Sequence, residues 1–540
     1  MRTLSTTLTA AQKSFTFVPI WKIVLSRSGQ TTKGYDKTRV ISITQTDGEG
    51  AEIVLNNQGN LVTSIDFEHY QVVVSYGCFT SVSRTAWATG TAYALDDIRV
   101  PTTANGYQYR CSVAGTSHAT TEPTWPTDLG VTVTDNTVTW EMDGNSGDEY
   151  SRTAPMRVRA QELHSGRGIL KCILRCIGMS QQMAEDKATA EYTQLSADTN
   201  TVQTLITAIA QVTLAPFTTY TSFTVNYDST DSLIGTFVPK DYFRVNLNDN
   251  RLEKIDWLLS HTGCKRREGN DGKLHILDPT NTGTTYDYEY EFNVSGSHTF
   301  FSKSVRNRFI NPNKVIAASH PDHSPQYTGS STSATSYALD PKTQTVYRRL
   351  DSSAQAGLIA AALIEQYELD AERGFATVPM NAGQELWDYV KVTDSRQGDS
   401  KVGNIQFLQR NVKIPTGNEG LTFNMMIAFG KVTAQSLLAN MITAQGEAGV
   451  PAPKLPKITK LPNITNITNI TKVTVLSPTT PTTPPFDPTQ LIVAIQELFD
   501  YLVDTRETLN ALISAYNDLI TQATVPKWHV TQQLIIPVVV

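Results

Sequence analysis

The sequence predicts a mainly β fold with some α-helix, followed by an extended β stalk and a coiled coil. Short stretches that alternate apolar and polar residues recur along residues 1–432, which is the pattern of half-buried strands. Only a few stretches place apolar residues at helical spacing. After residue 448 the sequence changes to strict periods of three and then seven. With 540 residues, the chain is long enough for three or four domains.

The first predicted domain combines residues 1–85 with residues 145–185. Strands are expected at "TRVISITQTD", "AEIVLN", "HYQVVVSYG", "APMRVRAQEL" and "GILKCILRCIGM". In the last stretch, Leu170, Cys172, Leu174 and Cys176 fall on one face of the strand. We therefore assign the Cys-x₃-Cys pair to the hydrophobic core rather than to a metal site. The five cysteines are too few, and odd in number, for a disulfide framework.

Residues 86–144 differ in composition from the strands on either side. They are dense in Thr, Gly, Trp and Tyr and contain almost no aliphatic runs. The pattern indicates a small all-β module inserted into a surface loop, where insertions are tolerated.

Two further domains are expected, an α+β domain over 186–300 and a strand-rich domain over 301–448. The stretch "NRLEKIDWLLSHTG" predicts a helix with Leu252, Ile255 and Leu259 on one face, ended by Gly263. The stretch "SSAQAGLIAAALIEQYELDAERG" predicts a second, Ala-rich helix ended by Gly374. "GKLHIL" and "YDYEYEFNV" are expected to be strands.

Residues 449–486 are predicted to form an extended stalk. Eight apolar residues step by three without a slip: Leu455, Ile458, Leu461, Ile464, Ile467, Ile470, Val473 and Leu476. An extended chain with three residues per turn would place them on one narrow stripe, which a single chain cannot bury. We expect a parallel bundle of three copies, so a homotrimer. The alternative is a disordered linker, which the nearby prolines favour.

Residues 487–525 are predicted to form a coiled coil. The seam alternates steps of four and three through Leu491, Ile495, Leu498, Leu502, Thr505, Leu509, Leu512, Tyr516, Leu519 and Ala523. Pro526 ends the helix. Residues 526–540 are expected to form a strand-like tip.

Several function classes are disfavoured by the sequence. The net charge of −6 argues against tight nucleic-acid binding, which would require a basic face. The first residues have no apolar core of the signal-peptide kind, and no run has the length of a membrane span, so synthesis in a cytoplasm is expected. No catalytic motif is found, so we expect no enzyme and no cofactor. His320, Asp322 and His323 are interpreted as a solvated loop rather than a metal site.

The insert resembles the small chitin-binding-type carbohydrate modules that recur in phage tail proteins. The matching positions are Trp87, Tyr93, Asp97, Val100, Gly106, Tyr107, Tyr109, Cys111, Pro123, Trp125 and Trp140. The resemblance implies sugar binding by aromatic stacking, with Trp87, Tyr93, Tyr107, Tyr109 and Trp125 as candidates and Trp140 as the expected core residue. The alternatives are that such aromatic residues form the module's core, or that the insert is a docking or spacer module.

The rest of the globular sequence resembles the tail-hub (baseplate-hub) proteins of tailed bacteriophages. The residues that carry the likeness are "NRLEKIDWLLSHTGCKRREGNDGKLHILDP", "KSVRNRFINPNKVIAASH" and "AALIEQYELDAERGFATVPMNAGQELWDYVKVTDSRQG". The resemblance implies tandem tube-like β-barrel domains, over 1–85 plus 145–185 and over 301–448. Three copies would form a ring that closes the tail tube and carries a central fibre.

The resemblance to tail-hub proteins implies a location at the tail tip of the virion. Its implied partners are the distal tail protein, the tape measure, other tail-tip or fibre proteins and a host cell-surface polysaccharide. The alternatives are a receptor-binding tail fibre or spike and a tail-associated cell-wall-degrading enzyme.

Overall fold

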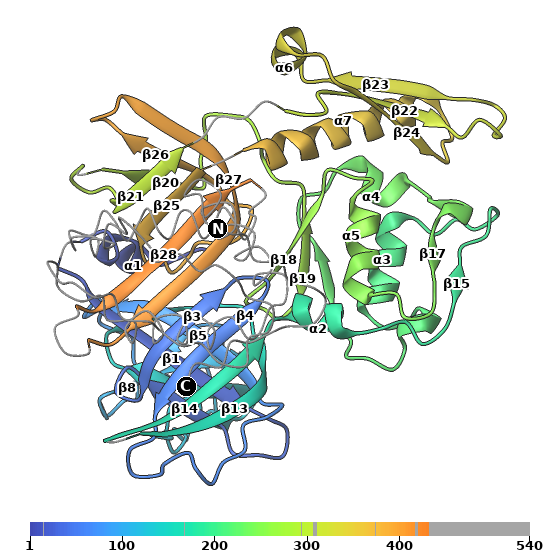
Figure 1. Ribbon diagram of the computed structural model, residues 1–540. Coiled ribbons are helices and arrows are strands. Elements are labelled where there is room, and N and C mark those ends of the chain that lie inside the picture. The colour runs from blue at the N-terminus through green and yellow to red at the C-terminus, as the bar shows by residue number, and fades with distance from the viewer. Residues whose placement is uncertain are drawn as a thin grey trace, which may run out of the picture. The chain divides into compact units, whose positions relative to one another are not determined.

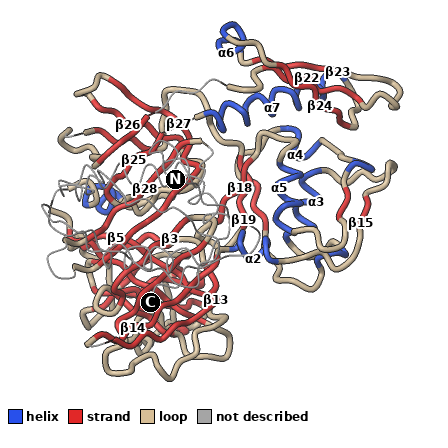
Figure 2. The backbone as a smooth tube through the Cα atoms, in the orientation of Figure 1, coloured by secondary structure: helices blue, strands red, loops and turns tan. Residues whose placement is uncertain are grey.

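The computed structural model describes residues 1–430 except 15, 167, 293, 306–309, 373 and 416–419. The predicted stalk, coiled coil and tip strand lie outside the described residues and stay predictions. Figure 2 shows that strands outnumber helices in the described part, so the fold is mainly β with some α-helix, as predicted. No helix among the described residues has the length and apolar character needed to cross a membrane.

The largest structure is one sheet that joins strands from both ends of the described chain. Its order is β2 (Lys33–Asp36), β1 (Val18–Ser26), β5 (Gln71–Phe79), β13 (Met156–Gly166), β14 (Ile169–Ile177), β4 (Gly50–Asn56), β3 (Val40–Thr46), β27 (Asp399–Lys413), β28 (Thr422–Phe429), β25 (Gly374–Pro379) and β21 (Ser302–Val305). Beside this path, β12 (Asp148–Arg152) pairs with β5, and β26 (Tyr389–Asp394) pairs with β27 and β20 (Tyr288–Glu291). The early and late strands meet where β3 pairs with β27. A single hydrophobic core runs through both groups.

The alternating sequence of the strands explains which side chains enter this core. Cys172, Leu174 and Cys176 of β14 are buried, as the one-face pattern predicts. All five cysteines are free and buried. Among the described residues, no group of three or more His, Cys, Asp or Glu side chains is arranged to hold a metal ion.

A second core belongs mainly to helices and short strands. Its elements are α2 (Met179–Glu185), α3 (Val202–Ala210), α4 (Ser232–Thr236) and α5 (Arg251–Leu259), with the pair β15 (Tyr192–Thr193)–β17 (Arg244–Val245) and the sheet β16 (Val225–Tyr227)–β19 (Leu274–Leu277)–β18 (Lys265–Glu268). The predicted helix α5 is present, and the Asn250 side chain caps its N-terminus by accepting bonds from two backbone N–H groups.

The Ala-rich helix α7 (Ser353–Ala371) is also present, capped by Ser352. It packs on the sheet β23 (Thr328–Thr332)–β22 (Lys314–Ser319)–β24 (Thr343–Arg348), next to α6 (Ala334–Leu339) (Figure 1). Val315 of β22 and Ile359 and Leu363 of α7 belong to the second core. The cores therefore do not follow the expected 301–448 boundary. Periodicity alone does not show which core a helix with buried residues on several sides will join.

The insert has a core of its own. It contains the sheet β10 (Thr132–Asp135)–β11 (Val138–Asn145)–β8 (Tyr107–Val113)–β7 (Ile98–Arg99) and the pair β6 (Ala92–Tyr93)–β9 (Gly115–Thr116). It is held to the first strands by a buried ion pair between Lys22 of β1 and Asp143 of β11, whose Nζ and Oδ1 are 2.6 Å apart. Lys22 also lies over the Tyr150 ring at 4.1 Å. The N-terminal helix α1 (Thr6–Ala11) precedes these strands.

Candidate functional site

Three of the five aromatic residues predicted to bind sugar are buried in the insert's core. Trp87 is 5% exposed, Tyr93 is 4% exposed and Tyr109 is fully buried. They pack around Trp140, which is fully buried as predicted. Their ring faces contact protein, so the stacking role assigned to Trp87, Tyr93 and Tyr109 is wrong for this conformation. A small module with few aliphatic residues must use its rings as core.

Trp87 and Trp140 share one acceptor in this core. Asp135 Oδ2 accepts a hydrogen bond from the Trp87 Nε1–H at 2.8 Å and from the Trp140 Nε1–H at 3.2 Å. The Asp135 carboxylate thus satisfies both buried indole donors. This arrangement fits a structural role for both tryptophans.

The two remaining candidates, Tyr107 and Trp125, are partly exposed. The Trp125 ring lies on the Tyr109 ring with the centroids 4.3 Å apart. Its Nε1–H donates to Glu122 Oε1 at 2.8 Å. Trp125 is therefore held in one orientation while part of its ring stays accessible, which is what a stacking residue requires.

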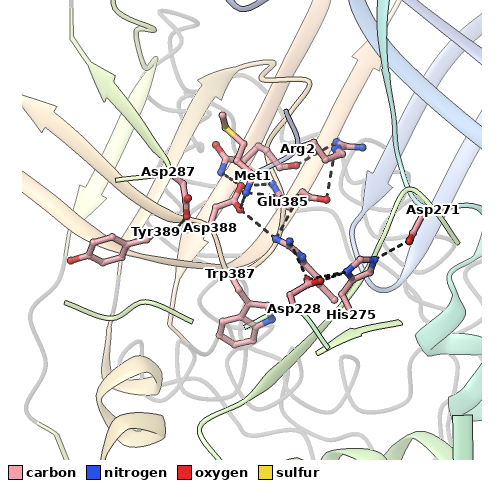
Figure 3. Close-up of polar contacts among 12 residues, drawn as sticks. Met1, Arg2, Asp228, Asp271, His275, Asp287, Glu385, Trp387, Asp388 and Tyr389 are labelled. Atoms are coloured by element: carbon pink, nitrogen blue, oxygen red, sulfur yellow. Dashed lines mark hydrogen bonds and ion pairs between the residues drawn. The ribbon is translucent and has the colours of Figure 1, made fainter. Parts of the chain in front are cut away.

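A second candidate site is an ionic junction with a buried Asp388 and partly exposed Met1 and Arg267. Its members are Met1, Arg2, Arg267, Glu385 and Asp388 (Figure 3). The Met1 amino nitrogen lies 2.5 Å from Asp388 Oδ1. Arg267 Nη1 lies 3.3 Å from Glu385 and 3.6 Å from Asp388. The junction therefore joins the first residues of the chain, strand β18 and the loop before β26.

The ionic junction reaches the first strand group through Arg2 and the second core through Asp228 and His275. Arg2 donates to the carbonyl oxygens of Arg152 and, at 2.8 Å, of Ala382. Arg267 Nη2 lies 3.8 Å from Asp228, whose carboxylate is 2.9 Å from His275 Nδ1. Figure 3 shows the chain of contacts from Met1 to His275. The ionic junction thus connects residues that are far apart in the sequence through ion pairs and hydrogen bonds.

Burial dominates the electrostatics of the ionic junction. It raises the pKa of Asp388 to about 7, although the Met1 amino group and the hydrogen bonds oppose the shift. It lowers the pKa of Arg2 to about 10, with the nearby Arg410 acting in the same direction. Such pairs add little net stability, because the cost of removing the charges from water offsets their attraction.

Sequence reasoning missed the ionic junction. Arg2, Arg267 and Asp388 are separated by more than a hundred residues each, and no local pattern connects them. In the folded chain, Trp387 beside the junction takes a left-handed backbone with φ of 67°, which is rare for a large side chain and which the sequence does not reveal. Its Nε1–H donates to the Arg266 carbonyl oxygen at 3.0 Å, next to the junction.

The predicted oligomerisation residues, from Leu455 to Leu519, lie outside the described residues. The predicted loop with His320 and Asp322 is exposed, and the two side chains approach to 3.3 Å.

Comparison with known proteins gives likenesses of structure only. No protein-family model matches the sequence, and no curated protein matches it. Several solved structures match. Three of them are a tail protein from Neisseria meningitidis MC58 (10% identity, 76% of this chain and 96% of that chain, TM-score 0.45), the 43 kDa tail protein of prophage MuSo2 from Shewanella oneidensis (12%, 76% and 98%, 0.39) and the prophage tail protein gp18 from Listeria monocytogenes EGD-e (12%, 78% and 99%, 0.38). The chain is similar in structure to these tail proteins.

Proposed function

We propose that the protein is the structural hub of a bacteriophage tail tip. Three copies form a ring that closes the tail tube, and each chain contributes two tube-like barrels. One observation carries the proposal: pairing of β3 with β27 joins an early and a late group of antiparallel strands into one sheet with one core. Because each chain has two such strand groups, a ring of three chains contains six of them.

The ends of this sheet support assembly with other copies. β2 and β21 lie at the two ends of the main strand order, and each has only four residues. An exposed edge presents unpaired backbone N–H and C=O groups, and ring closure removes such edges. The sequence resemblance to tail hubs supports the same assembly.

The ionic junction suits this mechanical role. Arg2 contacts Arg152 beside the first strand group and Ala382 beside the second, while Arg267 brings in the second core. A ring that carries load needs its two halves held at a fixed angle, and a buried network with defined partners supplies that constraint.

The C-terminal part completes the proposal. Residues 449–525 form the trimeric fibre on the ring axis, with Leu455 through Leu476 stacked inward, and the tip faces the host cell. The protein is then a virion component that contacts other tail proteins.

The test is the assembly state of the full chain. Light scattering after size-exclusion chromatography should give three times the chain mass. Ile467→Asp should break the stalk, because three carboxylates would share one apolar layer, while the described domains still fold. Thr468→Asp is the matched control, since its side chain is expected to face outward. A wild-type chain that stays a monomer or a dimer would refute the hub proposal.

A second proposed function is glycan binding by the insert. Trp125 favours it, because it is a partly exposed indole held by Tyr109 and Glu122. Trp125→Ala should reduce retention on a polysaccharide column by about five- to 150-fold, from the ~1–3 kcal/mol of base–aromatic stacking. Trp387→Phe, far from the insert in sequence, is the control. Equal retention of Trp125→Ala and wild type would exclude this role for Trp125.

A further inference from the structure

Glu122 is the hydrogen-bond partner of the partly exposed Trp125 in the insert. Its Oε1 accepts the Trp125 indole N–H at 2.8 Å and the Thr102 backbone N–H at 2.8 Å. Its Oε2 accepts the Thr102 hydroxyl. Burial alone would raise the pKa of Glu122, but the hydrogen bonds from Thr102 and Trp125 outweigh it and lower the pKa. The hydrogen bonds therefore favour the ionised Glu122 carboxylate, next to the partly exposed Trp125 ring.

Two loops are tied together around this carboxylate. Besides the contact between Thr102 and Glu122, Asn105 Nδ2 donates to the Tyr109 hydroxyl at 2.7 Å. That hydroxyl donates to the Pro126 carbonyl oxygen at 2.8 Å. The loop at 102–105 and the loop at 122–126 are thus fixed to each other, with Trp125 between them. The surroundings of Trp125 are built before any ligand arrives.

The insert carries an excess of acidic residues, and Glu122 has no basic partner in the described part of the chain. Residues 86–144 contain seven acidic residues and two basic ones: Asp96, Asp97, Glu122, Asp128, Asp135, Glu141 and Asp143 against Arg99 and Arg110. Arg110 pairs with Asp96 and Glu141, and Arg99 lies 3.8 Å from Asp97. No basic side chain lies within 4 Å of Glu122 among the described residues. A polyanion that stacks on Trp125 would meet the Glu122 carboxylate at close range.

We propose that Glu122 positions Trp125 for stacking and selects the ligand by charge. Neutral or amino-bearing glycans are accepted, because the Glu122 carboxylate can accept hydrogen bonds from their hydroxyl or ammonium groups. Acidic polysaccharides are repelled. This inference rests on the proposed glycan binding, and its two parts are tested separately.

The positioning part is tested without ligand. Trp125 emission is isolated as the difference between each protein and the same protein carrying Trp125→Phe. Glu122→Ala should make Trp125 more accessible to acrylamide quenching, since the indole loses its anchor. Asp128→Asn, an exposed carboxylate of the same module, should not. Unchanged Trp125 quenching in Glu122→Ala would overturn the positioning role, whatever the insert binds.

The charge part is tested with three columns of stated charge: chitin, chitosan and polygalacturonate. Wild type should be retained on chitin and chitosan and should pass through polygalacturonate. Glu122→Gln should reduce retention on chitosan about tenfold, as expected for the loss of one charge-assisted hydrogen bond, and should increase retention on polygalacturonate. Asp128→Asn should behave as wild type.

Two outcomes would contradict the charge part in different ways. Retention of wild type on polygalacturonate as strongly as on chitin would overturn charge selection while leaving glycan binding intact. If wild type is retained on none of the three columns, both glycan binding and charge selection are overturned. The acrylamide quenching result then still decides whether Glu122 positions Trp125.

Discussion

Lys22→Met should destabilise the protein more than any exposed lysine substitution, because it leaves a buried carboxylate unpaired. The Lys22 side chain is 1% exposed and the Asp143 side chain is 5% exposed, with 2.6 Å between Nζ and Oδ1. Methionine keeps most of the apolar stem, so the loss is mainly that of the charge. Breaking a buried pair costs about 3–5 kcal/mol. Asp143 keeps its bond from Gln108 at 3.1 Å, so we expect a loss near 3 kcal/mol in the free energy of unfolding.

The assay is urea unfolding followed by intrinsic fluorescence at one fixed protein concentration, because assembly makes stability concentration-dependent. Lys37→Met, at an exposed lysine, should change the free energy of unfolding by less than about 0.5 kcal/mol. Lys22 opposes the effect of burial on Asp143 and lowers the pKa of that carboxyl. The Lys22→Met defect should therefore shrink in acid, where Asp143 takes up a proton. A loss equal to that of Lys37→Met, or one independent of pH, would refute the reasoning.

Three further outcomes are expected. Val212→Gly should stabilise the protein by roughly 0.5–1 kcal/mol, because Val212 has a φ of 54° at the end of α3 and glycine adopts this angle without strain. A urea midpoint of Val212→Gly below that of wild type would contradict this prediction. Burial lowers the pKa of His275, but the hydrogen bonds to Asp271 and Asp228 outweigh burial and raise it. Protonated His275 should therefore stabilise the fold below pH 6.5 and lose that contribution as the pH rises through the raised pKa. His275→Gln should flatten this part of the pH profile of the free energy of unfolding, and an unchanged profile would contradict the role of His275. Replacing residues 86–144 with a short Gly-Ser bridge should leave the rest of the protein folded and assembled, because the insert has its own core. Loss of the assembled species in size-exclusion chromatography would contradict this prediction.

Local structure was predictable because it depends on local patterns. The one-face pattern of Cys172 and Leu174 identified β14, and the periodicity of Ile359 and Leu363 identified α7. Neither pattern specifies a partner. The helix α7 joined the second core rather than the late strand group, since burial on several of its sides allows either packing.

The site was harder to predict because inward and outward aromatic residues look alike in sequence. Trp87 and Trp125 both matched the resemblance to carbohydrate modules, yet Trp87 is buried on Asp135 and Trp125 is partly exposed. The ionic junction of Arg2 and Asp388 depends on contacts between distant parts of the chain. Only the folded arrangement brings such charges together.

The central claim is that the chain is the ring-forming hub of a tail tip, and an image of the assembled full chain tests it most directly. Electron microscopy of the purified protein, averaged without imposed symmetry, should show a ring of three chains with a six-fold appearance and a thin central fibre on its axis. A ring with another number of chains, or separate elongated particles without a ring, would contradict the account.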